Sequence, residues 1–404
     1  MLIVAGWATV WHPAISRIAR PDDSAFQPDR IARGAELAAI GDCAVCHTAD
    51  GGRPYAGGRG IPTPFGTVYA TNITPDPRTG IGTWSEAAFR RAMRDGIDRA
   101  GRHLYPVLPY PHFTRASDAD IAAMYAFLMT RAPVRQTPPR NRLPFPLNNR
   151  ILLAGWNLLY LRPGPWQPDP AHDADWNRGA YLVEAIGHCG ACHTPHNALG
   201  AERGALALGG GEAEHWYAPA LQAASPARDP WTRDALATYL RTGFQAQHGA
   251  AAGPMTAVTE ELAQVPEADI RAIARYIAFF MPKAAPEPPH TRTSGDQPAA
   301  AMFAGACGGC HAADAPMTRS GAPPLSFGTA VNAPTPQDVI EIILHGIPWR
   351  EGKAAPYMPA FGDALTDAQV ADLAGYVRAH DSDKPPWTDL PAAVARARQG
   401  GGAS

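Results

Sequence analysis

Three short runs of cysteine and histidine carry the most distinctive chemistry in the chain. The runs are 43–47, 189–193 and 307–311, and each reads Cys-x-x-Cys-His. All six cysteines of the 404 residues lie in them. This spacing is the attachment signature of c-type haem, in which two thiols bond to the haem and the adjacent histidine binds the iron. The runs therefore predict three covalently bound haem c groups.

Two other kinds of site also use cysteine pairs. A structural zinc ion needs four ligands, and each run supplies three. Thioredoxin-like redox pairs do not require the trailing histidine. Haem attachment accounts for the whole pattern, so the predicted thioether residues are Cys43, Cys46, Cys189, Cys192, Cys307 and Cys310, and the predicted iron ligands are His47, His193 and His311.

The second face of each iron needs a further ligand or an open position. A methionine thioether there raises the reduction potential. Met255 in Gly-Pro-Met-Thr and Met358 in Tyr-Met-Pro-Ala-Phe-Gly lie on loops ahead of a final helix, as such a ligand requires. We expect them to bind the second and third irons.

The first run has no methionine at the matching place. A count from His47 equal to the interval that leads to Met255 ends beside Leu108, and leucine cannot bind iron. Either the first haem is five-coordinate or another side chain replaces methionine, and His112 is the best substitute. Ligation by His/His or His alone would make this haem the low-potential member. Weaker candidates are His103, Met93 and Met124.

The sequence around the runs repeats. A short helix is expected before each run, over 33–37, 178–182 and 299–305, and the first two begin Arg-Gly-Ala. Each copy should end in a helix whose acidic residues suit the helix N-terminus. These helices are expected over 118–127, 267–276 and 367–376, with Phe127, Tyr276 and Tyr376 at one shared position. One ancestral domain in three copies is the simplest interpretation.

Composition limits the remaining possibilities. Lys and Arg number 35 and Asp and Glu 37, a balance that argues against a nucleic-acid-binding protein. The 42 prolines and 39 glycines predict many loops and short helices. The apolar run 151–161 is too short to span a bilayer, which needs about 20 residues. We interpret it as a helix packed on the domains, or else as a surface for a membrane or partner.

The expected architecture is mainly α, with three tandem domains joined by Pro-rich connectors. The N-terminal residues resemble the end of a signal or anchor segment but lack a preceding basic region. The division that we expect is 1–24 for this remnant and lead-in, 25–135 for domain 1, 136–172 for a connector with the apolar helix, 173–284 for domain 2, 285–297 for a linker, 298–382 for domain 3 and 383–404 for a C-terminal tail.

The arrangement resembles the three-haem cytochrome c subunits of bacterial periplasmic dehydrogenases, which contain class I cytochrome c domains. The resemblance covers about residues 25–382. It rests on the haem runs and on the segments 63–67, 71–75, 80–82, 103–106, 216–219 and 253–255. Similarity to the cytochrome subunits of molybdenum hydroxylases, such as nicotinate, isoquinoline and aldehyde oxidoreductases, is closer, at 109–114, 145–147, 154–156 and 196–200.

This resemblance implies an electron-transfer subunit without substrate chemistry of its own. It implies a catalytic partner containing molybdenum cofactor and iron–sulfur clusters, and a quinone, soluble cytochrome or terminal oxidase as acceptor. It also implies a place at the outer face of the cytoplasmic membrane. The alternative partners are quinoprotein alcohol dehydrogenases and flavoprotein gluconate- or sorbitol-type dehydrogenases. A peroxidase using an open first haem, and a haem-based sensor, are competing functions.

Overall fold

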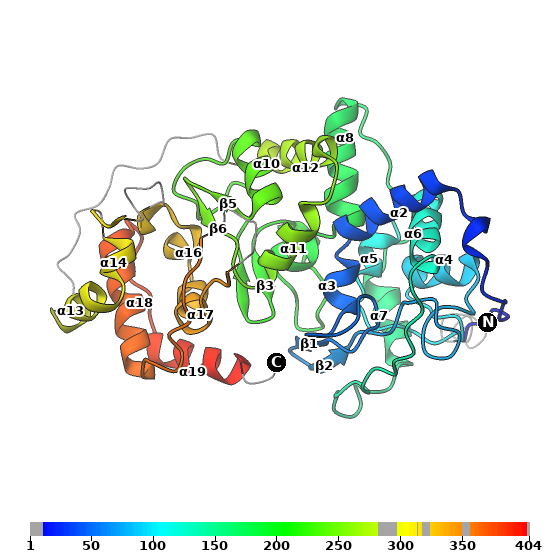
Figure 1. Ribbon diagram of the computed structural model, residues 1–404, viewed down its shortest axis with the longest axis horizontal. Coiled ribbons are helices and arrows are strands. Elements are labelled where there is room, and N and C mark those ends of the chain that lie inside the picture. The colour runs from blue at the N-terminus through cyan, green and yellow to red at the C-terminus, as the bar shows by residue number, and fades with distance from the viewer. Residues whose placement is uncertain (1–10, 282–296, 313, 317–323, 350–355, 402–404) are drawn as a thin grey trace. The chain divides into compact units, whose positions relative to one another are not determined.

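The computed structural model describes residues 11–281, 297–312, 314–316, 324–349 and 356–401 (Figure 1). Residues 1–10 of the N-terminal remnant lie outside the described residues, as does most of the linker 285–297. The chain divides into two compact units. The first contains 1–191, 198–201 and 264–273, and the second contains 192–197, 202–263 and 274–404. The boundaries of the three domains stay predictions.

The first unit is built from helices and one short hairpin. Strands β1 and β2 of the hairpin pair antiparallel. The elements are η1 (Asp23–Ala25), α2 (Pro28–Ile40), α3 (Cys43–His47), β1 (Gly60–Thr63), β2 (Gly66–Tyr69), α4 (Glu86–Asp95), α5 (Tyr110–Phe113), α6 (Asp118–Met129), α7 (Leu152–Tyr160), α8 (Ala174–Tyr181) and the π-helical turn η2 (Leu182–Ile186).

The crossing of α2 and α6 forms the core of this unit. Both helices were expected from the repeat, and the structure confirms them. Gly34 lies at the crossing, because a Cβ there would be 2.0 Å from the carbonyl oxygen of Ala123 and 2.7 Å from Phe127. The Ser117 hydroxyl caps α6 by accepting the backbone N–H of Asp120. The glycine thus lets two backbones approach where any side chain would separate them.

The second unit contains two further antiparallel hairpins, β3–β4 and β5–β6, among its helices. Helix α9 (Gly190–His193) crosses the boundary of the units, and α12 (Glu267–Phe280) does so as well. The other elements are η3 (Gly204–Leu206), β3 (Gly211–Ala213), β4 (Trp216–Ala218), α10 (Arg233–Thr242), β5 (Phe244–Gln245), β6 (Gly249–Ala250), α11 (Pro254–Leu262), α13 (Gln297–Ala306), α14 (Gly308–His311), η4 (Leu325–Phe327), α16 (Thr329–Asn332), α17 (Gln337–His345), α18 (Asp367–Asp381) and α19 (Leu390–Gly401).

The last helices of the second unit share one apolar core. Residues of α17, α18 and α19 meet in it, including Val370 and Leu373, and Trp387 joins them. Val394 of α19 is fully buried. The segment expected to be a C-terminal tail therefore contributes a packed helix to this core. The helices expected at 267–276 and 367–376 are present as α12 and α18, and the mainly helical class is confirmed.

Candidate haem sites

The attachment runs lie on single helical turns. Helix α3 covers the whole first run, and α9 and α14 cover the second and third runs except for the first cysteine of each. Cysteines three residues apart on one helical turn present their sulfur atoms on the same side. The residue before the first cysteine has a left-handed conformation in two runs, with φ 50° at Asp42 and 37° at His188. Each turn can therefore bind a planar group through both thiols.

The first two predicted iron ligands, His47 and His193, are held in the form that could bind a metal. The Nδ1–H of His47 donates to the backbone oxygen of Thr71 at 2.6 Å, and that of His193 donates to Pro219 at 2.6 Å. Since Nδ1 carries the proton, the Nε2 lone pair is the one directed to a metal. Burial lowers the pKa of both imidazoles and keeps them neutral. The donor set fits haem iron.

These two carbonyl groups explain segments that the sequence singled out only by resemblance. Thr71 opens the segment 71–75, and Pro219 closes the segment 216–219. Their role as acceptors could not be predicted, because every residue has a backbone carbonyl and the residue type does not show which one accepts a hydrogen bond. Similar spacing after each histidine was the available signal. In the third run, burial lowers the pKa of His311, so this imidazole too is held neutral.

The three loops that carry the predicted distal positions share one register. Helices α4, α10 and α17 each end at a glycine with positive φ, namely Gly96 (62°), Gly243 (73°) and Gly346 (71°). The residue twelve positions after each glycine is, in order, Leu108, Met255 and Met358. Counting from these helix-ending glycines therefore gives the same alignment of Leu108 with the two methionines as counting from the histidines.

The backbone around these positions is fixed in each loop. Met255 lies in the first turn of α11. Met358 exchanges two backbone hydrogen bonds with Ile347, of 2.9 and 3.0 Å. The carbonyl of Leu108 accepts the backbone N–H of Tyr110 at 2.7 Å. All three side chains are partly buried, as a ligand to a bound group would be.

The substitutes considered for Leu108 lie in different environments. Nδ1 of His112, on α5, lies 2.8 Å from the backbone oxygen of Glu184. The His103 side chain is buried, and its ring meets that of His12 edge-on. Met93 and Met124 are buried in α4 and α6. His112 is the one of the four that stands next to the second attachment turn.

The residues that lead into the first two attachment runs contact one another within the first unit. A Cβ at Gly41 would be 3.3 Å from the carbonyl oxygen of Ile186, and a Cβ at Gly187 would be 3.5 Å from that of Ile40. Nε2 of His188 lies 3.2 Å from the backbone oxygen of Gly41. Equivalent glycines therefore bring the backbones of two haem-attachment turns into direct contact.

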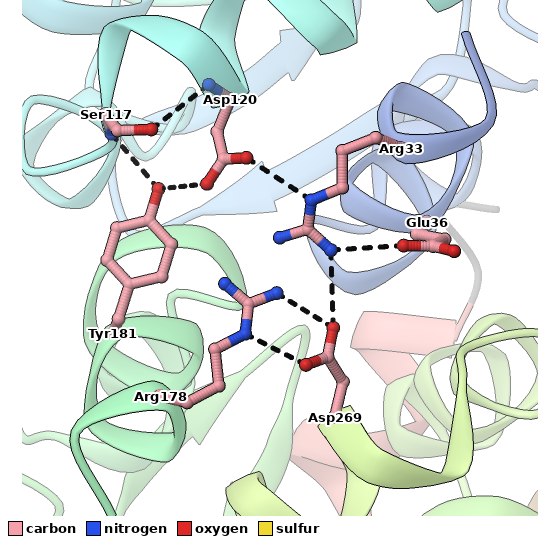
Figure 2. A network of polar contacts seen from close by, with 7 residues as sticks. All are labelled: Arg33, Glu36, Ser117, Asp120, Arg178, Tyr181 and Asp269. Atoms are coloured by element: carbon pink, nitrogen blue, oxygen red, sulfur yellow. Dashed lines mark hydrogen bonds and ion pairs between the residues drawn. The ribbon is translucent and has the colours of Figure 1, made fainter. Parts of the chain in front are cut away.

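A network of charged side chains fastens the helices that lead into these turns (Figure 2). Arg33 of α2 contacts Asp120 of α6 at 3.3 Å, and Arg178 of α8 contacts Asp269 of α12 through two bonds of 2.9 and 2.8 Å. The same pair thus occurs in each of the first two repeats. The repeats are then joined by Arg33 to Asp269 at 3.4 Å and by the Tyr181 hydroxyl, which donates to Asp120 at 2.6 Å.

The network corrects one interpretation of the sequence. The acidic residues that open these helices were expected to suit the helix N-terminus, but the Asp120 and Asp269 side chains are only 15% and 13% exposed and serve as ion-pair partners. Hydroxyl groups cap α6 and α18 instead, at Ser117 and Thr366. The third repeat has Gln369 at the equivalent position, where it completes a capping box. The repeated Arg-Gly-Ala was the signal for the network.

Neutralising Asp269 should weaken the first unit. Burial favours the neutral acid, but the hydrogen bonds and charge of Arg178, with that of Arg33, outweigh it and hold the pKa of Asp269 below its usual value. Asp269→Asn should lower the free energy of unfolding by about 2 kcal/mol at pH 7. The pKa of Asp269 is lower in the folded protein than in the unfolded chain, where it is about 4. The ionised side chain therefore stabilises the fold at pH values above about 4, and this stabilisation is lost as the pH falls below that toward the folded-state pKa.

Chemical unfolding followed by circular dichroism, at pH 7 and near pH 3, measures the difference in unfolding free energy between the wild type and Asp269→Asn. It should be large at pH 7 and should shrink at pH 3. Asp118→Asn is the matched control, because the Asp118 carboxylate is 68% exposed in its pair with Arg94. Exposed pairs contribute about 0–1 kcal/mol. Equal losses in the two variants would contradict a special role for the network.

The second repeat contains a buried histidine that sequence reasoning missed. The ring of His248 stacks on that of Trp231, with centroids 3.5 Å apart and planes at 13°. The residue is 3% exposed, and neither ring nitrogen has a hydrogen-bond partner among the described residues. Burial lowers its pKa to about 4, so the ring is neutral. Such an unsatisfied buried ring fits a domain in which a bound group completes the interior.

Comparison with known proteins agrees with this geometry. Residues 31–132 match the family model for cytochrome c, and 174–277 and 295–377 match that for cytochrome c oxidase, cbb3-type, subunit III. The chain is 37% identical over 391 residues to the fructose dehydrogenase cytochrome subunit of Gluconobacter japonicus, covering 88% of this chain and 80% of that one. It is 38% identical over 377 residues to the gluconate 2-dehydrogenase cytochrome c subunit of Pantoea cypripedii, covering 86% and 85%.

The chain belongs to the family of cytochrome c subunits of dehydrogenases. As a member it is an electron-transfer protein whose cytochrome c domains bind haem c covalently. It is also 47% identical over 402 residues to a nicotinate dehydrogenase subunit of Pseudomonas putida, covering 97% of this chain. This cytochrome chain spans about a third (34%) of that relative's length.

Proposed function

We propose that this cytochrome subunit carries three haem c groups and passes electrons from a catalytic dehydrogenase to the respiratory chain. The observation that carries the proposal is the threefold recurrence of an attachment turn with a helix, glycine and distal loop in one register. The haems supply one-electron iron chemistry when bound. The cysteines hold them, the histidines and the distal residues set their potentials, and the protein supplies no substrate chemistry.

The partner that we propose is a molybdenum hydroxylase with iron–sulfur clusters. The support is the 47% identity to a nicotinate dehydrogenase subunit, together with the segments 109–114, 145–147, 154–156 and 196–200. A second candidate is a quinoprotein alcohol or flavoprotein gluconate- or sorbitol-type dehydrogenase. The identities to fructose and gluconate dehydrogenase subunits favour it. In both cases we place the subunit in the periplasm, at the cytoplasmic membrane, with a quinone, soluble cytochrome or terminal oxidase as acceptor.

Purification of the native complex tests the function and separates these partners. The tagged subunit should contain three haems per chain and should be reduced by the substrate of the subunit that co-purifies. Molybdenum in that subunit supports the first partner, and pyrroloquinoline quinone or flavin supports the second. A chain with fewer than three haems, or one that turns over peroxide without a partner, would overturn the proposal.

For the first iron we propose His112 as the ligand opposite His47. Donation of its Nδ1–H to the carbonyl of Glu184 repeats the arrangement of the two proximal histidines. His112→Ala should then convert one of the three haems to the high-spin state in the visible and electron paramagnetic resonance spectra. Arg115→Gln is the control, since it removes the neighbouring 2.6 Å pair with Glu184 but no ligand. An unchanged spectrum in His112→Ala would favour an open first site.

A further inference from the structure

Exposed apolar side chains gather around the connector helix α7. The described residues contain 13 exposed large hydrophobic side chains, and seven of them lie in this region. Leu199 belongs to the region because its carbonyl accepts the indole N–H of Trp156 at 2.9 Å. These seven residues, which we name the α7 patch, are Phe145, Leu147, Ile151, Leu152, Leu158, Leu159 and Leu199. Isolated exposed hydrophobic residues are ordinary, but a concentration of this kind marks an interaction surface.

The patch stands on a rigid support. Leu153 and Ala154 on the other side of α7 are buried. The Asn157 side chain accepts the hydroxyl of the buried Tyr110 at 2.6 Å. Leu158, by contrast, is 72% exposed. The interpretation of this helix as simply packed on the domains therefore holds for one side, and the other side remains apolar and open.

The segment that carries most of the patch has charged side chains of a single sign. Residues 121–168 contain six arginines and no Asp or Glu, within a chain whose net charge is −2. The arginines are Arg131, Arg135, Arg140, Arg142, Arg150 and Arg162. Those at 135, 140, 142 and 162 are exposed, and Arg150 instead donates to the backbone oxygen of His103 at 2.8 Å. An apolar helix in a segment whose only charged side chains are cations matches the acyl boundary and anionic headgroups of a bilayer.

We propose that the α7 patch docks this subunit on an anionic phospholipid surface, with α7 lying in the interface. The described part of the chain has no helix long and apolar enough to cross a membrane. Helix α7 has nine residues, enough to lie at the headgroup boundary but far fewer than the roughly 20 of a span. Trp156 and Tyr160, on the same helix, are the residue types that favour this boundary. The inference rests on the proposed location of the protein at the membrane.

Vesicle co-sedimentation of the full-length holoprotein tests the surface. Vesicles of phosphatidylcholine with phosphatidylglycerol should bind the protein, and phosphatidylcholine alone should bind it less. Binding should weaken as salt screens the arginines. Leu158→Glu with Leu159→Glu should reduce the affinity for anionic vesicles by more than about tenfold, because two carboxylates would enter the apolar layer. Leu206→Glu, at an exposed leucine elsewhere, is the matched control and should bind as the wild type does.

Haem content and reduction by the partner dehydrogenase are measured on the same variants. If they are unchanged while vesicle binding is lost, the surface is confirmed independently of the electron-transfer function. Equal vesicle binding by the variant, or none by the wild type, would overturn the proposal. Loss of the co-purifying dehydrogenase with vesicle binding intact would overturn it as well and would make the patch a protein interface.

Discussion

Changing Met358 to alanine should lower the reduction potential of one haem by on the order of 0.1 V or more, since axial ligands set haem potentials over about 0.8 V. Met255→Ala should do the same to a different haem. The physical reason is that a thioether favours the reduced iron, and its loss leaves water or a stronger donor in its place. Potentiometric titration, with the haem bands recorded in the visible spectrum, measures both shifts.

Because the three loops share one register, the opposite change, adding a methionine to the first loop, can also be tested. Leu108 stands at the same distance from a helix-ending glycine as the two methionines. In a protein that also carries His112→Ala, Leu108→Met would place a thioether at the corresponding position of the first repeat. The lowest of the three potentials should then rise. A gain there and a loss at Met255 would show that one loop geometry serves all three sites.

A core methionine provides the control. Met93 is buried in α4, and Met93→Leu preserves its volume, so the cost to stability should be less than about 1.5 kcal/mol. The three haem reduction potentials of Met93→Leu should equal those of the wild type. Unchanged potentials in both Met255→Ala and Met358→Ala would refute the distal ligand assignments, whereas shifts in all variants alike would indicate a general loosening of the protein.

Changing Gly34 to valine should prevent the first repeat from folding normally. A Cβ at this position would come within 2.0 Å of the Ala123 carbonyl oxygen, which belongs to the backbone of α6 and cannot rotate away. Overpacking of a core costs about 1–3 kcal/mol or more, and here α2 and α6 must separate to admit the side chain. Thermal unfolding followed by circular dichroism, and haem content, should both show the loss.

Gly155→Ala is the opposite case within a helix. A Cβ at Gly155, on α7, would meet nothing within 4 Å. Alanine in a helix interior is favoured over glycine by about 0.5–1 kcal/mol, so this variant should be as stable as the wild type or more stable. A Gly34→Val protein that unfolds at the wild-type temperature would contradict the close crossing of α2 and α6.

Local features of the chain were predictable from sequence because they repeat. The attachment runs, the lead-in helices and the terminal helices follow from spacing and apolar periodicity, and the structure has α2, α6, α12 and α18 at those places. The exposed side of α7 was not predictable, since an apolar run looks the same whether it is covered or open. Only the packing of Leu153 against the fold, with Leu158 directed outward, distinguishes the two sides.

Long-range polar contacts were beyond the sequence for a different reason. Arg33 and Asp269 are 236 positions apart, and both residue types are common on protein surfaces. Nothing local separates a carboxylate that forms a network from one that suits a helix N-terminus. The same holds for His248, whose burial depends on the ring of Trp231. The repeated Arg-Gly-Ala became informative only when the structure showed that the arginine of each copy pairs with the equivalent aspartate.

The contact between the first two attachment turns has a consequence for how this gene could change by recombination. The predicted connector 136–172 would be an obvious crossover point, because it lies between the first two predicted copies of the repeat. Exchange there would pair an unrelated Gly41 surface with Ile186 and remove one half of the arginine–aspartate network. A chimaera joined in the connector should therefore be less stable than one joined beyond the end of α12.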